Sequence, residues 1–295
     1  MSLSTDLQTH RRYLVGVAYR MLGTLSEAED VVQEAALRVR DVKTADHPRA
    51  YLTRVVTRLC LDVLKSAHRR RMTYVGPWLP EPLHDISDFT GAAAGEGDLA
   101  DDLSIGLLYA LERLSPLERA AFLLHDVFGM SFADIATTLD RSEVACRQLA
   151  ARARKAVRQE RNHVAPARFP VSEADERAFF EAFLEASQSG DTTVLEGLLT
   201  RDVSLHSDGG DKVAAAINVL EGRDRVVRFL TGVWHKFRNA SVVRVEYVRV
   251  NGSLAMLSHH KDGSLDLLTV ERDGGRISAV YFLRNPDKLQ AFRES

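Results

Sequence analysis

The sequence has little cysteine and no long hydrophobic run. Its only cysteines, Cys60 and Cys146, lie far apart in segments predicted to be helical, so buried reduced thiols are a better interpretation than a disulfide or metal site. No apolar run approaches the roughly 20 residues that a membrane-spanning helix needs, and the N-terminus lacks a signal-peptide pattern. We therefore expect a cytoplasmic protein with no membrane partner, no metal and no other cofactor.

The chain also carries little net charge, formally −2 at pH 7, which argues against an indiscriminate nucleic-acid binder. The charges are nevertheless unevenly distributed. Residues 38–71 and 141–161 are rich in lysine and arginine, whereas residues 81–134 are mainly acidic. Two separated basic segments are expected of a protein that contacts the phosphates of one DNA duplex twice. Solvated helix faces would look the same, so charge alone leaves both interpretations open.

The 295 residues favour two or three compact units, and the first 165 are predicted to form helices with short breaks. Capping-box sequences, which mark helix starts, begin at Thr24, Ser115, Ser131 and Ser172. One exception is the stretch 74–97, which is rich in proline and glycine and contains WLPEP at 78–82. It is predicted to be an extended linker.

The pattern changes after residue 171. Helical patterns there are followed by strand-like runs at 203–206 and 213–219, and by a helix near 222–237. Four runs of alternating polarity complete the chain. Hairpin-turn sequences separate them, at Asn251-Gly252, Asp262-Gly263 and Asp273-Gly274-Gly275. This part is predicted to be an α+β unit with a curved antiparallel sheet.

Residues 26–40 form an amphipathic helix in this prediction. Its polar stripe consists of Asp30, Gln33, Glu34 and Leu37, and its apolar face of Val31, Val32, Ala35, Ala36 and Val39. The apolar face is expected to pack inward. The stripe is then available to a partner protein, although an ordinary solvated face would have the same pattern.

The helices that follow combine an apolar interior with many basic side chains. The candidates for contacting DNA are Arg54, Arg58, Lys65, Arg69, Arg70 and Arg71. Guanidinium groups suit both phosphate contacts and base-edge hydrogen bonds.

The second basic segment has the form of a helix-turn-helix. A short helix, Phe132 to Leu139, precedes a tight turn at Asp140-Arg141 and a longer helix from Ser142. In such motifs the second helix enters the major groove, where arginine reads guanine. The predicted DNA-facing residues are Arg141, Ser142, Glu143, Arg147, Gln148, Ala151, Arg154, Lys155 and Arg158.

The segments SEAEDVVQEAALRVR, PRAYLTRVVTRLCLDVLKSAHRRR and LSPLERAAFLLHDVFGMSFADIA resemble regions 2 and 4 of extracytoplasmic-function (group IV) sigma factors. The resemblance implies two partners, promoter DNA and core RNA polymerase with its β′ and β subunits. It assigns the stripe of Asp30, Gln33, Glu34 and Leu37 to the β′ coiled coil. Region 2 would read the minus-ten element and region 4 the minus-thirty-five element.

Three further motifs resemble the subgroup of these sigma factors with a fused C-terminal SnoaL-like domain, thought to replace a separate anti-sigma protein. They are WLPEP, DGGDK at 208–212 and NPDKL at 285–289. The implied regulatory interface comprises Trp78, Leu79, Pro80, Glu81, Pro82, Asp208, Gly209, Gly210, Asp211, Lys212, Asn285, Pro286, Asp287, Lys288 and Leu289. Asp211 departs from the usual DGGGK, and a positive φ at that position would strain it.

The expected fold class is multidomain: two all-α sigma domains, the second a helix-turn-helix, followed by an α+β SnoaL-like, cone-shaped domain. The expected boundaries are 1–73 for region 2, 74–99 for the linker, 100–163 for region 4 and 171–291 for the SnoaL-like domain. The expected function is promoter-specific initiation, regulated by the fused domain.

Two alternatives remain open. One is a polymerase-independent helix-turn-helix regulator, and the other is a DNA-binding protein with an enzymatic SnoaL-like domain. His206, Asp208, Trp234, His259 and His260 could line a pocket, but their spacing matches no reaction motif, so we expect no enzyme and no catalytic residue. Two interpretations of this domain remain open: a sensor pocket for a small unidentified ligand, and a domain whose interior is filled only by packing.

Overall fold

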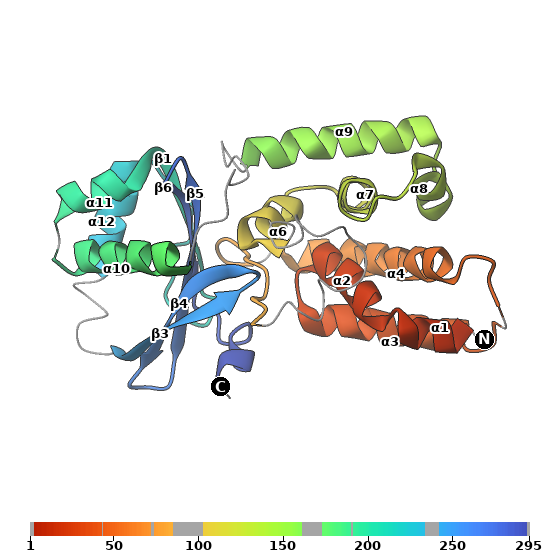
Figure 1. Cartoon of the computed structure of the whole chain (residues 1–295), viewed down its shortest axis with the longest axis horizontal. Coiled ribbons are helices and arrows are strands. Elements are labelled where there is room, and N and C mark those ends of the chain that lie inside the picture. The colour runs from red at the N-terminus through yellow and green to blue at the C-terminus, as the bar shows by residue number, and fades with distance from the viewer. Residues whose placement is uncertain are drawn as a thin grey trace. The chain divides into compact units, whose positions relative to one another are not determined.

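The computed structural model describes residues 3–42, 44–71, 74–84, 103–160, 173–189, 191–233 and 242–293. The chain divides into two compact units (Figure 1). Unit 1 comprises Met1–Thr73, Ile86–Leu103 and Leu107–Glu160. Unit 2 comprises Tyr74–Asp85, Ser104–Gly106 and Arg161–Ser295. No helix among the described residues is long and apolar enough to cross a membrane.

The first part of unit 1 is a helical bundle of α1 (Leu3–Thr9), α2 (Arg11–Leu22), α3 (Leu25–Val39) and α4 (Pro48–Arg71). Helix α2 is its centre, and every residue from Leu14 to Leu22 is buried. It ends where Gly23 adopts a left-handed φ of 79° and donates its N–H to the Tyr19 carbonyl. Cys60 is buried in α4 as a free thiol, and burial raises its pKa.

The second part of unit 1 contains most of α6 (Ile105–Glu112), from Leu107 onward, and then α7 (Pro116–Phe122), the π-helical turn η2 (Leu123–Val127), α8 (Phe132–Leu139) and α9 (Glu143–Glu160). Ser115 forms the predicted capping box with Glu118, and the Ser131 hydroxyl accepts the N–H of Asp134. Asp140, with a φ of 55°, ends α8 in the predicted tight turn.

Unit 2 is an α+β domain. Its helices are α10 (Glu173–Ser189), α11 (Thr192–Leu198) and α12 (Arg223–Val233), with a final 3-10 turn, η4 (Gln290–Phe292). Its strands are β1 (Leu199–Asp208), β2 (Leu220–Glu221), β3 (Val242–Val250), β4 (Ser253–His260), β5 (Leu265–Asp273) and β6 (Arg276–Leu283). The sheet order is β2-β1-β6-β5-β4-β3, in which only β1 and β6 are parallel.

The three helices of unit 2 lie together beside the sheet (Figure 1). One cluster of buried hydrophobic side chains joins them to it, including Phe180 and Phe183 of α10, Leu195 of α11 and Val226 of α12. Packed side chains therefore fill the space between the helices and the sheet. The predicted architecture of helical domains followed by an α+β domain is therefore confirmed.

The predicted hairpin turns are correct: Gly252, Gly263, Gly274 and Gly275 all have positive φ between successive strands. The predicted strand at 213–219 is wrong, since those residues form bends and irregular backbone, and only Leu220–Glu221 pairs with β1. The helix expected near 222–237 is described as Arg223–Val233. The Ser172 capping sequence, Trp234 and the linker beyond residue 84 lie outside the described residues.

Candidate functional site

The predicted polar stripe of α3 lies on the surface of unit 1. Asp30, Gln33, Glu34 and Leu37 are all exposed, and Leu37 is 60% exposed although it is a large apolar residue. Glu34 pairs with Arg38 one turn later, at 2.9 Å. The opposite face is buried as predicted, except that Ala36 is only half-buried. The exposed Leu37 gives the C-terminal end of this polar stripe an apolar part.

The basic residues of α4 differ in their surroundings. Arg58 donates hydrogen bonds from Nε and Nη2 to the carbonyls of Thr138 and Thr137, at 3.1 and 3.2 Å. These carbonyls lie at the C-terminal end of α8, where helices leave acceptors unused. Lys65 is exposed and pairs with Asp62, and Arg54 is half-buried. The side chains of Arg69, Arg70 and Arg71 lie outside the described residues.

A second arginine also joins the two parts of unit 1, but it belongs to the second part and contacts the first. Arg119 of α7 is almost fully buried, and its Nη1 donates to the Met21 carbonyl and to Glu112, both at 2.6 Å. Burial lowers the pKa of this guanidinium to about 9. Tyr13 and Phe128 add an edge-to-face contact with ring centroids 5.4 Å apart. The α2–α4 bundle and the helix-turn-helix thus contact each other within unit 1.

The second helix of the helix-turn-helix has one packed and one exposed face. Cys146, Leu149, Ala153 and Val157 are buried, whereas Ala156 is half-buried. The exposed residues include all the predicted DNA-facing ones except Arg154, which is partly buried: Arg141, Ser142, Glu143, Arg147, Gln148, Ala151, Lys155 and Arg158. Arg147 pairs with Glu143 at 2.7 Å, and Arg154 pairs with Asp126 at 2.7 Å.

Within unit 2 the WLPEP, DGGDK and NPDKL motifs meet at Asp208, whose side chain is completely buried. Its Oδ1 accepts hydrogen bonds from the Tyr74 hydroxyl at 2.5 Å and the Gly210 N–H at 3.0 Å. Its Oδ2 accepts from the Leu79 N–H at 2.9 Å and from Lys288 Nζ at 2.7 Å. Burial and the neighbouring Asp208 carboxylate raise the pKa of Tyr74 above its usual range.

Lys288 completes this arrangement. Its ammonium group also donates to the Leu79 carbonyl and lies 3.9 Å from the centre of the Trp78 ring, a cation–π contact. Asn285 donates to the Tyr74 hydroxyl at 3.0 Å. We call the set of Tyr74, Leu79, Asp208, Asn285 and Lys288 the Asp208 clamp. It ties residues 74–79 to both the end of β1 and the NPDKL segment.

The other interface residues surround the clamp. Leu79, Pro80, Pro82, Gly209 and Leu289 are buried, Trp78, Glu81, Gly210 and Pro286 are half-buried, and Lys212 pairs with Asp287 at 2.6 Å on the surface. A Cβ on Gly210 would lie 2.4 Å from the Asn285 side chain, so this position needs glycine. Asp211 has a φ of 60°, the left-handed conformation in which glycine is the usual residue.

Sequence reasoning missed two residues of this region. It used Tyr74 only as a boundary, and it interpreted Asn251 only as a turn residue. In the structure the Asn251 side chain accepts the Leu83 N–H at 2.8 Å, and its own N–H reaches the Leu83 carbonyl at 3.0 Å. A tyrosine just before WLPEP was the available signal for Tyr74. Nothing in the sequence linked Asn251 to Leu83, 168 positions earlier.

The C-terminal histidines are held by local contacts. His260 is 2.8 Å from Asp266, which also accepts from Arg284 at 2.8 Å. Burial pushes the pKa of Asp266 upward, but hydrogen bonds from His260 and Arg284 outweigh it and hold the pKa below its usual value. His259 contacts Glu246, and His206 stacks on Tyr281. No group of three or more metal-ligating side chains is found among the described residues.

The fold and these surfaces define a class of protein. A helix-turn-helix with an exposed basic recognition helix joins a helical bundle that presents a polar stripe, and an α+β domain holds the connecting segment. Sigma-70 region 2 matches residues 7–70, and Sigma-70 region 4 matches residues 105–157. The class is that of RNA polymerase sigma factors.

Comparison of the whole chain gives the family. It is 38% identical to ECF RNA polymerase sigma factor SigJ of Mycobacterium tuberculosis (strain ATCC 25618 / H37Rv), over 97% of this chain and 92% of that protein. It is 34% identical to the probable ECF RNA polymerase sigma factor SigI of the same strain, over 99% and 96%. The SigJ crystal structure superposes with a TM-score of 0.76 and 32% identity, over 97% and 98%. The chain belongs to the extracytoplasmic-function sigma factors.

Proposed function

We propose that this sigma factor binds the β′ subunit of core polymerase through α3 and reads promoter DNA through α9 and α4. The observation that carries the first part is the exposure of Asp30, Gln33, Glu34 and Leu37 on one face, with a buried face behind it. An exposed leucine next to polar side chains is suited to a protein interface, which combines apolar and polar contacts. The β subunit is the second polymerase partner that the resemblance implies.

The exposed face of α9 supports the promoter-reading role. Arg147 lies near the N-terminal end of the helix, where recognition helices contact base edges. The ion pair between Arg147 Nη2 and Glu143 fixes one nitrogen of the guanidinium group. Lys155 and Arg158 lie further along the same exposed face and suit phosphate contacts.

The contacts inside unit 1 support a closed, polymerase-free state. Region 2 and region 4 read separate promoter elements, whereas here Arg58 binds the end of α8 and Arg119 binds the end of α2. Arg58 is a candidate DNA contact, so its hydrogen bonds to Thr137 and Thr138 compete with that role. We propose that promoter binding separates these two helical parts and frees Arg58.

The Asp208 clamp supports a regulatory role for unit 2. Residues 74–84 leave region 2 and carry no helix or strand, so the hydrogen bonds of the clamp decide where this segment lies. A switch needs two states with different contacts. We propose that the clamp is closed in one state and released in the other, which changes the freedom of the linker between the helical regions.

We propose that unit 2 is regulatory rather than catalytic. The Asp208 carboxylate already accepts four hydrogen bonds, and Asp266 is engaged by His260 and Arg284. Acid–base catalysis needs a group within reach of a substrate proton, and these carboxylates serve packing instead. Because its partners are polymerase and the chromosome, we propose that the protein acts in the cytoplasm.

Transcription in vitro tests these roles. Core polymerase with the full-length protein should initiate from specific promoters, whereas the protein without polymerase should bind the same DNA only weakly. Promoter binding of equal strength without polymerase would support a free-standing regulator instead. Adding Lys288→Ala, which opens the clamp, should change the transcript yield at equal polymerase occupancy. An unchanged yield would leave unit 2 without a regulatory role.

A further inference from the structure

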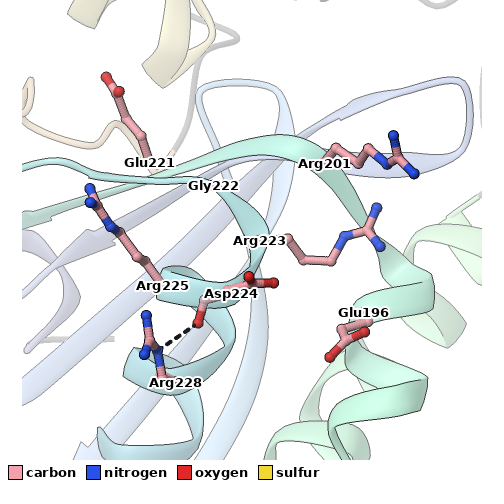
Figure 2. A pocket seen from close by; sticks show the side chains of 8 residues that line it. All are labelled: Glu196, Arg201, Glu221, Gly222, Arg223, Asp224, Arg225 and Arg228. Atoms are coloured by element: carbon pink, nitrogen blue, oxygen red, sulfur yellow. Dashed lines mark hydrogen bonds between the residues drawn. The ribbon is translucent and has the colours of Figure 1, made fainter.

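Unit 2 contains a second feature, separate from the Asp208 clamp, in which four arginines line one pocket. The pocket has a volume of about 440 Å³ and lies where α11, the start of β1 and the start of α12 meet (Figure 2). The arginines are Arg201 of β1 and Arg223, Arg225 and Arg228 of α12. None of the residues that line the pocket belongs to the hydrophobic core cluster that joins the helices to the sheet.

The four guanidinium groups, all positively charged, lie in two pairs on opposite sides of the pocket. Figure 2 shows the ends of Arg201 and Arg223 turned toward the same side of the pocket, with Arg225 and Arg228 together on the other side. Arg223 is half-buried and donates from Nε to the Thr200 carbonyl, at 3.4 Å. Arg228 donates from Nε to the Asp224 carbonyl, at 3.2 Å. Both of these backbone contacts use Nε.

Three acidic residues, Glu196, Glu221 and Asp224, also line the pocket. Within the described part of the chain, no ion pair joins any of them to the four arginines. Neighbouring guanidiniums repel each other unless an anion lies between them. The planar fork of arginine matches phosphate in a bidentate manner, so two arginines on one side suit a single phosphate group.

The other residues that line the pocket indicate which kind of molecule would carry the phosphate group. Apart from Gly222, every lining residue is charged, so the pocket offers neither an aromatic ring for stacking a base nor an apolar wall for an acyl chain. Carboxylates accept hydrogen bonds, and ligand hydroxyl groups can donate them. We propose that this pocket binds a small phosphorylated sugar or polyol, with its phosphate at Arg201 and Arg223 and its hydroxyls at the carboxylates. The inference is independent of the role proposed for the clamp.

Titration calorimetry on the full-length protein tests the site, with glucose 6-phosphate as the probe. Glucose 6-phosphate should bind, glucose should not, and AMP should bind no more tightly than the sugar phosphate. Arg201→Gln and Arg223→Gln should each weaken binding by about tenfold, the loss expected when a charged hydrogen-bonding group is removed. Arg201 is exposed on the strand, so its substitution leaves the fold intact even if Arg223→Gln disturbs the start of α12.

The matched control is Arg276→Gln, because Arg276 is also an exposed arginine of unit 2 but does not line the pocket. It should bind glucose 6-phosphate like the unmodified protein. Absence of binding at ligand concentrations on the order of 10 mM would overturn the proposal, as would equal affinity in all three variants. Displacement of the sugar phosphate by a short DNA duplex would also overturn it, because the phosphates recognised would then be those of DNA.

Discussion

Lys288 and Asp208 form an almost completely buried ion pair, with Nζ 2.7 Å from Oδ2 and side chains that are 8% and 0% exposed. Removing two charges from water is unfavourable, and the pair persists only because further polar groups satisfy it. Tyr74, Leu79 and Gly210 supply these hydrogen bonds to Asp208. The pair thus depends on residues 74–79, which in turn are positioned by it.

Loss of one partner should therefore be strongly destabilising. Lys288→Ala leaves a buried carboxylate without its counter-charge and should lower the free energy of unfolding of unit 2 by about 3 to 5 kcal/mol. Urea unfolding measures this loss, and hydrogen exchange at the Leu79 N–H should accelerate. The control is Lys212→Ala, which breaks the exposed pair with Asp287 and should change stability by less than about 1 kcal/mol. Equal losses in both variants would contradict the importance of burial.

Acid should weaken unit 2 through Asp266. Its pKa is lower in the folded protein than in the unfolded chain, so its contribution to stability is complete above the unfolded pKa and is lost as the pH falls through the folded pKa. Stability measured from about pH 5 to about pH 3 should fall more steeply in the unmodified protein than in Asp266→Asn. Parallel curves would show that Asp266 does not contribute to the acid sensitivity.

Polymerase binding should depend on the stripe of α3. Asp30→Ala combined with Gln33→Ala should weaken core polymerase binding by about tenfold or more while the melting temperature stays constant, since both side chains are exposed. Fluorescence titration of labelled protein with core polymerase measures the affinity. Gln8→Ala, at an exposed position on α1, is the control and should bind normally. Unchanged affinity of the double variant would place the polymerase contact elsewhere.

Upstream promoter discrimination should depend on Arg147. Arg147→Ala removes a potential bidentate base contact, so discrimination between the correct and a mutated upstream element should fall by about 1 to 3 kcal/mol. Arg152→Ala is the matched control, because Arg152 lies on the same helix but pairs with Glu118 of α7. Transcription from point-mutated promoters gives the comparison. If both variants discriminate like the unmodified protein, α9 does not read the upstream element through Arg147.

The turn after β1 should respond in opposite directions to two substitutions. Asp211→Gly relieves a left-handed φ and should raise the free energy of unfolding by up to about 1 kcal/mol, offset partly by the greater freedom of glycine in the unfolded chain. Gly210→Ala should lower it, because the new Cβ would collide with Asn285. Thermal unfolding of both variants measures the effects. Destabilisation by Asp211→Gly would mean that the aspartate makes a compensating contact.

The helical part, the α+β part and the turn positions were predictable from the sequence because they depend on local patterns, whereas the two sigma regions were identified through resemblance. The period of buried residues in α3 and α9, the capping boxes and the glycines between strands each act within a few positions. The wrong strand at 213–219 shows the limit of such reasoning. Residues 213–219 are mostly apolar, like a short buried strand, but they form bends and irregular backbone, and only Leu220–Glu221 pairs with β1.

The sequence by itself determined that Asp30, Gln33, Glu34 and Leu37 share an exposed face, since a helix of this composition buries the opposite face. It also grouped WLPEP, DGGDK and NPDKL, but only through resemblance. Tertiary structure alone decided that Asp208 binds Leu79 and Lys288, that Arg58 binds the end of α8, and that Arg201 and Arg223 line one pocket. These contacts join residues far apart in the chain, and no local propensity encodes which distant donor will reach a buried carboxylate. The folded backbone sets those distances.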